Sequence, residues 1–215
     1  PWDFSETLAA SHFNHPSAVL WPTSRGFDRG GFHGRNTKAV FADTYWKAEW
    51  DGVIGEDEEC PRTPFPMGGC YAVPAALLPR LGGYAPCLLG YGYEEEWLGM
   101  RAWLFGSEVR CVRSCAVQHQ YRRKSVPLRS VALEWWNRAV ASRLFFGQDR
   151  YNEEIQPRLL AAARAECGEE FNEVRLGMWD EAMEFERHVR ACTKRPLHAV
   201  LSALGMTVPG TLSTI

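Results

Sequence analysis

The first 128 residues mix the two hydrophobic spacings that distinguish strands from helices. Runs with the spacing or length of a strand cover 18–21, 70–73 and 108–118. Helical spacing, with apolar side chains three or four positions apart, covers 3–12, 74–81 and 97–105. The stretch 37–50 is periodic but fits either element. Because strands alternate with helices, the pattern predicts an α/β fold for this part of the chain.

From about residue 130 the pattern becomes helical throughout. Apolar side chains recur every three or four residues in the segments 130–146, 149–165, 169–190 and 197–204. We therefore divide the chain into an α/β part, residues 1–128, and a helical C-terminal region, residues 129–215. The aromatic residues of the first helix recur at helical spacing, so we expect them in a core; they are Trp135, Trp136, Phe145 and Phe146.

Composition excludes several classes of protein. Hydrophobic residues make up 46% and charged residues 23% of the 215 residues, which is typical of a globular chain and not of a disordered one. The net charge of -2 provides no overall basic field to attract nucleic acid or anionic lipid. No apolar run reaches the roughly 20 residues of a membrane span. Seven scattered cysteines, an odd number, predict free thiols and a cytoplasmic location.

Four short motifs place chemically useful groups at the ends of predicted elements. They are Met67-Gly68-Gly69, Tyr91-Gly92-Tyr93-Glu94-Glu95, Arg101-Ala102-Trp103 and His119-Gln120-Tyr121-Arg122. A glycine pair lets a ligand approach the backbone closely, and carboxylates at a helix N-terminus stay ionised and can accept protons. A neutral histidine nitrogen binds metal ions, and an arginine forms bidentate hydrogen bonds with phosphate. Within the third motif, we expect Arg101 and Trp103 to be structural.

In this order and spacing, the motifs resemble those of GT-A type glycosyltransferases. The nearest families are glycosyltransferase family 2 and the polypeptide N-acetylgalactosaminyltransferases, and Gly82-Gly83-Tyr84 adds a further match. The resemblance implies that residues 1–128 form the acceptor-side, C-terminal half of a GT-A (nucleotide-diphospho-sugar transferase) fold. The helical region would then be appended to it. The implied activity is transfer of a sugar from a nucleotide-sugar donor, expected to be a UDP-sugar, to an acceptor hydroxyl.

The resemblance assigns the acceptor side to the acidic turn. Glu95 occupies the position of the carboxylate base in inverting enzymes, so we expect it to deprotonate the acceptor hydroxyl, with inversion at the sugar. Glu94 matches a contact to the sugar or the acceptor. Tyr91 and Tyr93 would shape the same pocket around the donor sugar.

The donor side is assigned in the same way. Gly68 and Gly69 match the strand beside the donor sugar, and Arg122 matches an arginine that meets the donor pyrophosphate. His119 matches the third ligand of a divalent cation, Mn²⁺ or Mg²⁺. The Asp-x-Asp or Asp-x-His motif that supplies the other two ligands has no counterpart at the corresponding place. We therefore expect the nucleotide-binding half to be missing from this chain or to lie on another chain.

Two alternatives stay open. Cys111, Cys115 and His119 can be read as zinc ligands on one side of a strand, although a rise of about 3.3 Å per residue spreads them too far for one ion. A non-catalytic binding module would instead use the arginine-rich glycine loop at 23–35 and the cluster at 122–124 to hold an acidic partner or nucleic acid. Arg110, Arg113 and Arg129 would widen that patch. The acceptor of a transferase could itself be a modified nucleic acid.

Overall fold

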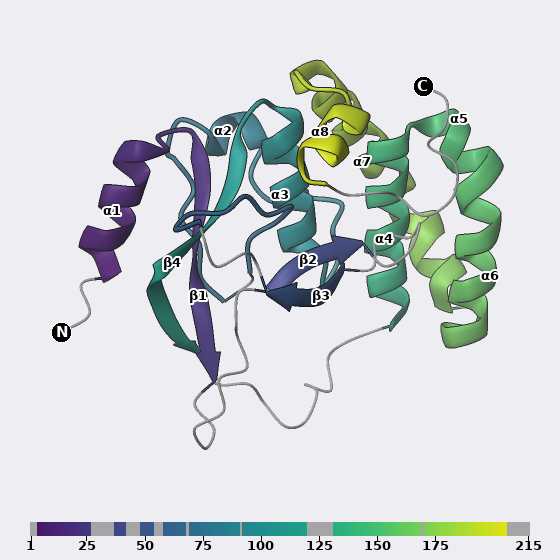
Figure 1. Ribbon diagram of the computed structural model, residues 1–215. Helices are drawn as coiled ribbons and strands as arrows, with labels where there is room; N and C mark the ends of the chain where they lie inside the picture. The colour runs from purple at the N-terminus through teal and green to yellow at the C-terminus, as the bar shows by residue number, and fades with distance from the viewer. Residues whose placement is uncertain are drawn as a thin grey trace.

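The computed structural model describes residues 4–26, 37–41, 48–53, 58–67, 69–90, 92–119, 131–168 and 170–205. Figure 1 shows a strand pair beside a central helix, with the long C-terminal helices on the far side. In chain order the elements are α1 (Phe4–Asn14), β1 (Ala18–Gly26), β2 (Thr37–Phe41), β3 (Ala48–Val53), α2 (Leu78–Leu81), α3 (Glu94–Leu104), β4 (Glu108–His119), α4 (Val131–Phe146), α5 (Gln148–Arg150), the π-helix η1 (Tyr151–Ile155), α6 (Gln156–Cys167), α7 (Glu170–Cys192) and α8 (Leu197–Ala203).

The strands form two pairs. β1 and β4 are parallel, whereas β2 and β3 are antiparallel, so the ambiguous stretch at 37–50 contributes two strands. Between the pairs Pro22–Val112 and Thr23–Ala116, β1 advances by one residue and β4 by four, which is a bulge in β4. β1 therefore continues past Pro22, where the sequence predicts its end. Proline is tolerated there because the regular ladder is interrupted at the same point.

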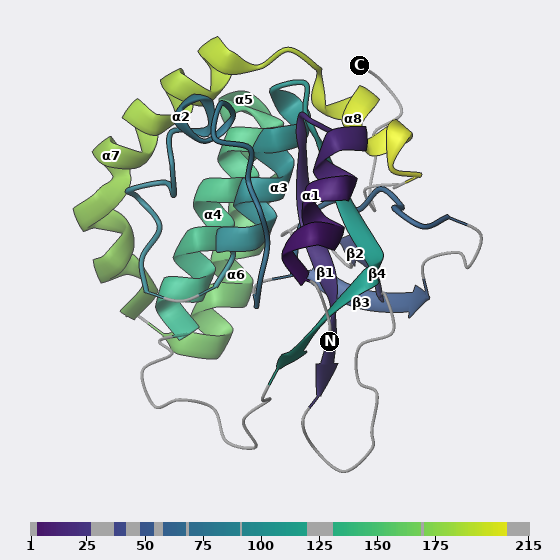
Figure 2. The same ribbon diagram turned by 90° about the vertical axis from the view of Figure 1, so that its left-hand side faces the viewer.

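Both faces of the β1–β4 pair are covered, which explains the uninterrupted apolar run at the start of β1. Leu20 faces α1 and lies in a small cluster with Leu8. The alternate residues Val19 and Trp21 belong to the main core, which includes most of α3. The figures agree on this layering: α1 lies on one side of the strand pair and α3 on the other (Figures 1 and 2).

The bulge overturns the expectation that Cys111 and Cys115 share one side of the strand. Cys111 is buried in the main core, whereas Cys115 is buried in the small cluster beneath α1. The extra residues of β4 change the alternation between these two positions. A zinc site that uses both thiols is therefore wrong, and the described residues contain no other group of three potential metal ligands.

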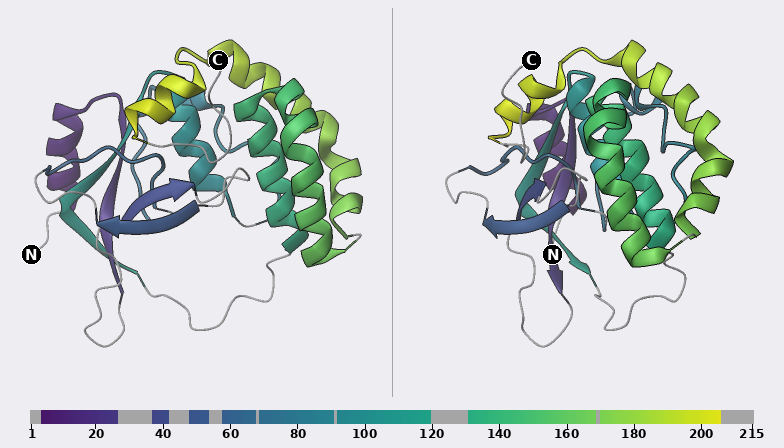
Figure 3. Two further views of the ribbon diagram at one scale, coloured as in Figure 1. Left: turned by 45° about the vertical axis from the view of Figure 1, so that its right-hand side comes forward. Right: turned by 90° about the vertical axis from the view of Figure 1, so that its right-hand side faces the viewer.

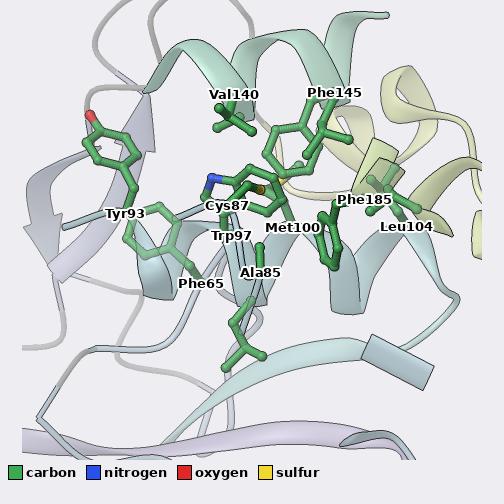
Figure 4. Close-up of a cluster of buried hydrophobic side chains, with 14 of the residues drawn as sticks. Phe65, Ala85, Cys87, Tyr93, Trp97, Met100, Leu104, Val140, Phe145 and Phe185 are labelled. Atoms are coloured by element: carbon green, nitrogen blue, oxygen red, sulfur yellow. The ribbon is translucent and has the colours of Figure 1, made fainter. Parts of the chain in front are cut away.

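The C-terminal helices pack directly on α3. Figure 4 shows Trp97 of α3 enclosed by Phe145 of α4 and Phe185 of α7, with ring centroids 5.8 Å and 5.7 Å from its own. Figure 3 shows α4, α6 and α7 packed together and α7 passing over the carboxyl end of α4. Trp135, Trp136 and Phe145 are buried, which confirms the expectation for these three, and Phe146 is partly buried.

Several predicted elements are shorter or more divided than expected. The strand predicted to end at Val73 is reduced to one antiparallel bridge between Ala72 and Leu20. The helix predicted at 74–81 is a turn followed by α2, because Leu77 N–H already bonds Pro74 O in a tight turn. The single helix predicted at 149–165 is divided among α5, η1 and α6. No helix among the described residues is long and apolar enough to cross a membrane.

Candidate functional site

The acidic motif lies at the N-terminus of α3, preceded by a turn of unusual backbone conformation. Gly90, Gly92 and Tyr93 all have positive φ, at 64°, 110° and 73°. Among the described residues, Tyr93 is the only one other than glycine with positive φ. Such a conformation costs free energy and persists only where its surroundings enforce it. The turn that presents Glu94 is therefore held in place by the structure around it.

Asn137 of α4 supplies most of that support. Its side-chain amide donates to Leu89 O at 3.1 Å and to Gly92 O at 2.8 Å, and its Oδ1 accepts from Leu89 N at 3.0 Å. The residue is almost fully buried. One buried amide thus satisfies three backbone groups of the turn, which secondary structure cannot satisfy.

Arg138, the next residue of α4, supports the turn from a second direction. Its guanidinium lies over the Tyr93 ring at 5.1 Å and over the Trp135 ring at 4.7 Å. It also forms an ion pair with Glu134 at 2.9 Å. Tyr93 is buried, with its hydroxyl turned away from the hydrophobic cluster in Figure 4. The helical region therefore shapes the backbone of the acidic turn.

The three consecutive carboxylates of this turn differ in their environment. Glu94 Oε2 accepts a hydrogen bond from Gly92 N–H at 2.7 Å. Burial, followed by repulsion from Glu94 and Glu96, raises the pKa of Glu95 to about 8. Burial likewise raises the pKa of Glu96 to about 7, and its Oε2 is enclosed without a hydrogen-bond partner among the described residues. Desolvation outweighs the favourable helix N-terminus, which by itself would keep these groups ionised.

Tyr84, from the Gly-Gly-Tyr motif, lies within electrostatic reach of the same carboxylates. Its pKa is raised by partial burial and then by the negative charges of Glu95 and Glu94. The side chain is 57% exposed. An exposed aromatic ring within electrostatic reach of a carboxylate is a suitable surface for a sugar or another planar ligand.

The expectation that Arg101 and Trp103 are structural is confirmed. Arg101 is fully buried, and its guanidinium donates to the carbonyl oxygens of Leu81 and Gly83, which fixes the Gly-Gly-Tyr segment. Trp103 Nε1 donates to Thr63 O at 2.9 Å. Both side chains hold loops against α3, and neither is available to a substrate.

The donor-side predictions are only partly covered by the structure. Gly69 lies in an exposed turn, whereas Gly68, Tyr91 and Arg122 lie outside the described residues. The backbone of His119 ends β4 opposite Gly26, and its side chain also lies outside the description. A short connection joins α3 to β4, so α3 runs antiparallel to the strand and begins towards its carboxyl end (Figure 1). The acidic turn and His119 thus lie towards the same end of the fold.

The basic patch of the alternative interpretation is partly neutralised. Arg110 forms ion pairs with Glu108 at 2.7 Å and with Glu58 at 3.3 Å. Its guanidinium also donates to Cys60 O. The cluster at 122–124 lies outside the described residues. Arg110 is therefore engaged within the protein and does not widen a phosphate-binding surface.

Two residues of this site are not among those that the sequence predicts, namely Asn137 and Tyr84. Asn137 is not part of any motif. The one signal in the sequence is that this polar residue occupies a position of the helix where the spacing predicts an apolar one. Tyr84 belongs to the Gly-Gly-Tyr match. That match marked the segment as part of the resemblance but assigned no role to the tyrosine side chain.

Comparison with solved structures finds the same fold in a glycosyltransferase. The crystal structure of GalNAc-T7 with UDP, GalNAc and Mn²⁺ superimposes with a TM-score of 0.68 at 14% sequence identity. The match covers 94% of this chain and 38% of that chain. It must therefore include most of the C-terminal helices, and this chain spans well under half the length of that protein. No protein-family model matches the sequence, and no curated protein is similar in sequence.

Proposed function

We propose that this chain forms the acceptor-side part of a glycosyltransferase, which moves a sugar from a nucleotide-sugar donor to an acceptor hydroxyl. The observation that supports it best is the acidic turn of α3, held by α4, within a fold like that of GalNAc-T7. GalNAc-T7 is a protein whose structure contains UDP and GalNAc. The match covers 38% of that chain. From the missing Asp-x-Asp or Asp-x-His motif, we infer that the nucleotide-binding half lies elsewhere.

Glu95 is the proposed general base. Its carboxylate would take the proton of the acceptor hydroxyl while that oxygen attacks the anomeric carbon of the donor. The bond from that carbon to the diphosphate breaks, and the diphosphate leaves with the electron pair, so the configuration inverts. A pKa of about 8 makes the ionised carboxylate a stronger base than an ordinary glutamate. The rate should therefore rise with pH as Glu95 loses its proton.

The groups around Glu95 would bind the sugar and the acceptor. Glu94 has one oxygen occupied by Gly92 N–H and offers the other to a hydroxyl. The exposed ring of Tyr84 would stack on the apolar face of a sugar. Tyr91 and Tyr93 complete the pocket in this proposal.

The donor diphosphate would be met by Gly68, Gly69 and Arg122, and a divalent cation by His119. The described side chains offer no group of three metal ligands, so they do not themselves form a cation site. We therefore derive no step through a metal ion from this chain. Dependence on Mn²⁺ or Mg²⁺ is part of the proposal and requires ligands from the nucleotide-binding half.

Two measurements test the proposal. Calorimetric titration of the complete protein, with its nucleotide-binding half, with UDP in the presence and absence of Mn²⁺ measures donor binding, which His119→Ala should abolish if His119 holds the cation. In a transfer assay with the complete protein, Glu95→Gln should lower kcat by about 10²–10⁴-fold without weakening UDP binding. Glu184→Gln, an exposed carboxylate on α7, serves as the control of equal charge change.

Each part of the proposal has its own contrary result. A product that retains the anomeric configuration would exclude the role of Glu95 as base. Undiminished transfer by Glu95→Gln would do the same. Absence of transfer from any nucleotide sugar, together with binding of an acceptor, would favour a non-catalytic binding module.

A further inference from the structure

A separate cleft lies at the carboxyl end of α4, away from the acidic turn. It encloses about 640 Å³ between the corner that joins α4 to α5 and the second half of α7. Along α4, the rise from Glu134 to Phe146 is about 18 Å. Glu134 lies beside the acidic turn, whereas Phe146 lines the cleft. Figure 3 shows α7 passing over this end of α4. The cleft is therefore distinct from the proposed transfer site.

Glu186, which lines the cleft, belongs to a cluster that contains more positive than negative charge. Glu186 accepts from Arg143 Nε at 2.8 Å and from Arg190 Nη2 at 2.7 Å, so one carboxylate serves two guanidinium groups. Arg143 and Glu186 are buried, whereas the side chain of Arg190 is 54% exposed towards the cleft. A partly desolvated cluster with one excess positive charge attracts an anion.

Two further guanidinium groups line the cleft. Arg187 is exposed and makes no ion pair with any residue that the structure describes. Arg150 pairs with Glu154 at 3.2 Å and lies over the ring of Phe146 at 5.4 Å. Asp149 is the other carboxylate of the lining. The lining thus contains three guanidinium groups, counting Arg190, and two carboxylates, and Arg187 is the guanidinium without an ion pair among the described residues.

The lining also offers apolar surface to the remainder of a ligand. Phe146 and Met183 line the cleft beside the arginines. Guanidinium groups bind planar or tetrahedral oxyanions through paired N–H donors, which makes arginine the preferred partner of carboxylate and phosphate. We propose that this cleft binds the carboxylate or phosphate group of an organic anion, with Arg187 and Arg190 as its principal contacts.

Calorimetric titration at constant ionic strength tests this site with two probes, inorganic phosphate and succinate. The wild-type chain should bind at least one of them saturably, and the tighter probe identifies the phosphate or the carboxylate as the recognised group. Arg187→Gln should weaken that binding roughly tenfold, the value of one charge-assisted hydrogen bond. This substitution removes no described ion pair, so folding should be unaffected.

Arg158→Gln is the matched control, because Arg158 is an exposed arginine of α6 that does not line the cleft. It should leave the affinity unchanged, as should Glu95→Gln at the proposed transfer site. The proposal is overturned if neither probe binds saturably, if Arg187→Gln binds like the wild type, or if Arg158→Gln weakens binding equally. None of these results bears on the transfer of sugar.

Discussion

Replacement of Asn137 by leucine tests whether the helical region holds the acidic turn. Leucine has the same number of side-chain heavy atoms as asparagine and the same branch point at Cγ, so the change removes the hydrogen bonds without leaving a cavity. It leaves Leu89 N–H, Leu89 O and Gly92 O without their side-chain partner. Each buried group that loses its partner costs about 1–3 kcal/mol. Because the turn is only half-buried, water can reach part of it, and the lower end of the range applies.

The expected loss is about 3 kcal/mol in the free energy of unfolding. For a chain of this size, that corresponds to a decrease of roughly 6–12 °C in Tm. Urea denaturation, followed by tryptophan fluorescence, measures the free energy directly. Asn137→Asp should also destabilise, because aspartate keeps the acceptor for Leu89 N–H but turns an oxygen towards the carbonyl oxygens of Leu89 and Gly92.

Asn152→Leu is the control, since Asn152 is an exposed asparagine of η1. It should change the free energy of unfolding by no more than about 0.5 kcal/mol. If Asn137→Leu lies within 1 kcal/mol of the wild type, or if both variants lose the same amount, the assignment of Asn137 as the support of the turn is wrong.

Two further predictions concern α3. Gly99→Ala should destabilise the protein by about 1–3 kcal/mol in urea denaturation, because the new Cβ would lie too close to Phe65 Cα. In an exposed helix, the same substitution would stabilise by about 1 kcal/mol. A stabilised variant would show that α3 does not pack so closely on this loop. In the folded protein the pKa of Glu96 is about 7, above its ordinary value of 4.5. The contribution of this carboxyl group to the free energy of unfolding is therefore complete below pH 4.5, and it is lost as the pH rises through 7. Between pH 4.5 and 8.5 the free energy of unfolding of the wild type should fall by on the order of 2–3 kcal/mol relative to that of Glu96→Gln. Urea denaturation at each pH measures this difference. If the two proteins show parallel pH profiles, the carboxyl group of Glu96 is not buried.

The positions of the helices were largely predictable from local pattern. The apolar spacing at 130–146 and 169–190 predicts α4 and α7 within two residues at each end. Glycine and proline punctuate these helices in the expected places. In contrast, the strand predicted to end at Val73 became a single bridge, because a pairing partner is a property of the fold and not of the local sequence.

The candidate site likewise combines features that are predictable from local sequence with features that depend on the fold. The acidic motif identified the N-terminus of α3 and its carboxylates, because charge and helix spacing are visible along the chain. The raised pKa of Glu95 was not predictable, since it depends on burial by segments distant in sequence. Nor was the role of Asn137, which lies 45 residues from the Gly92 carbonyl that it supports.

The sequence by itself determined which segments are helical, which residues could carry acid–base chemistry, and which class of fold was expected. These properties depend on spacing and residue type, which are local. Only the tertiary structure decided that Cys111 and Cys115 face different cores, that α4 holds the acidic turn, and that arginines from α5 and α7 share one cleft. Each of these depends on contacts between residues far apart in the chain, and such contacts form only when the elements pack.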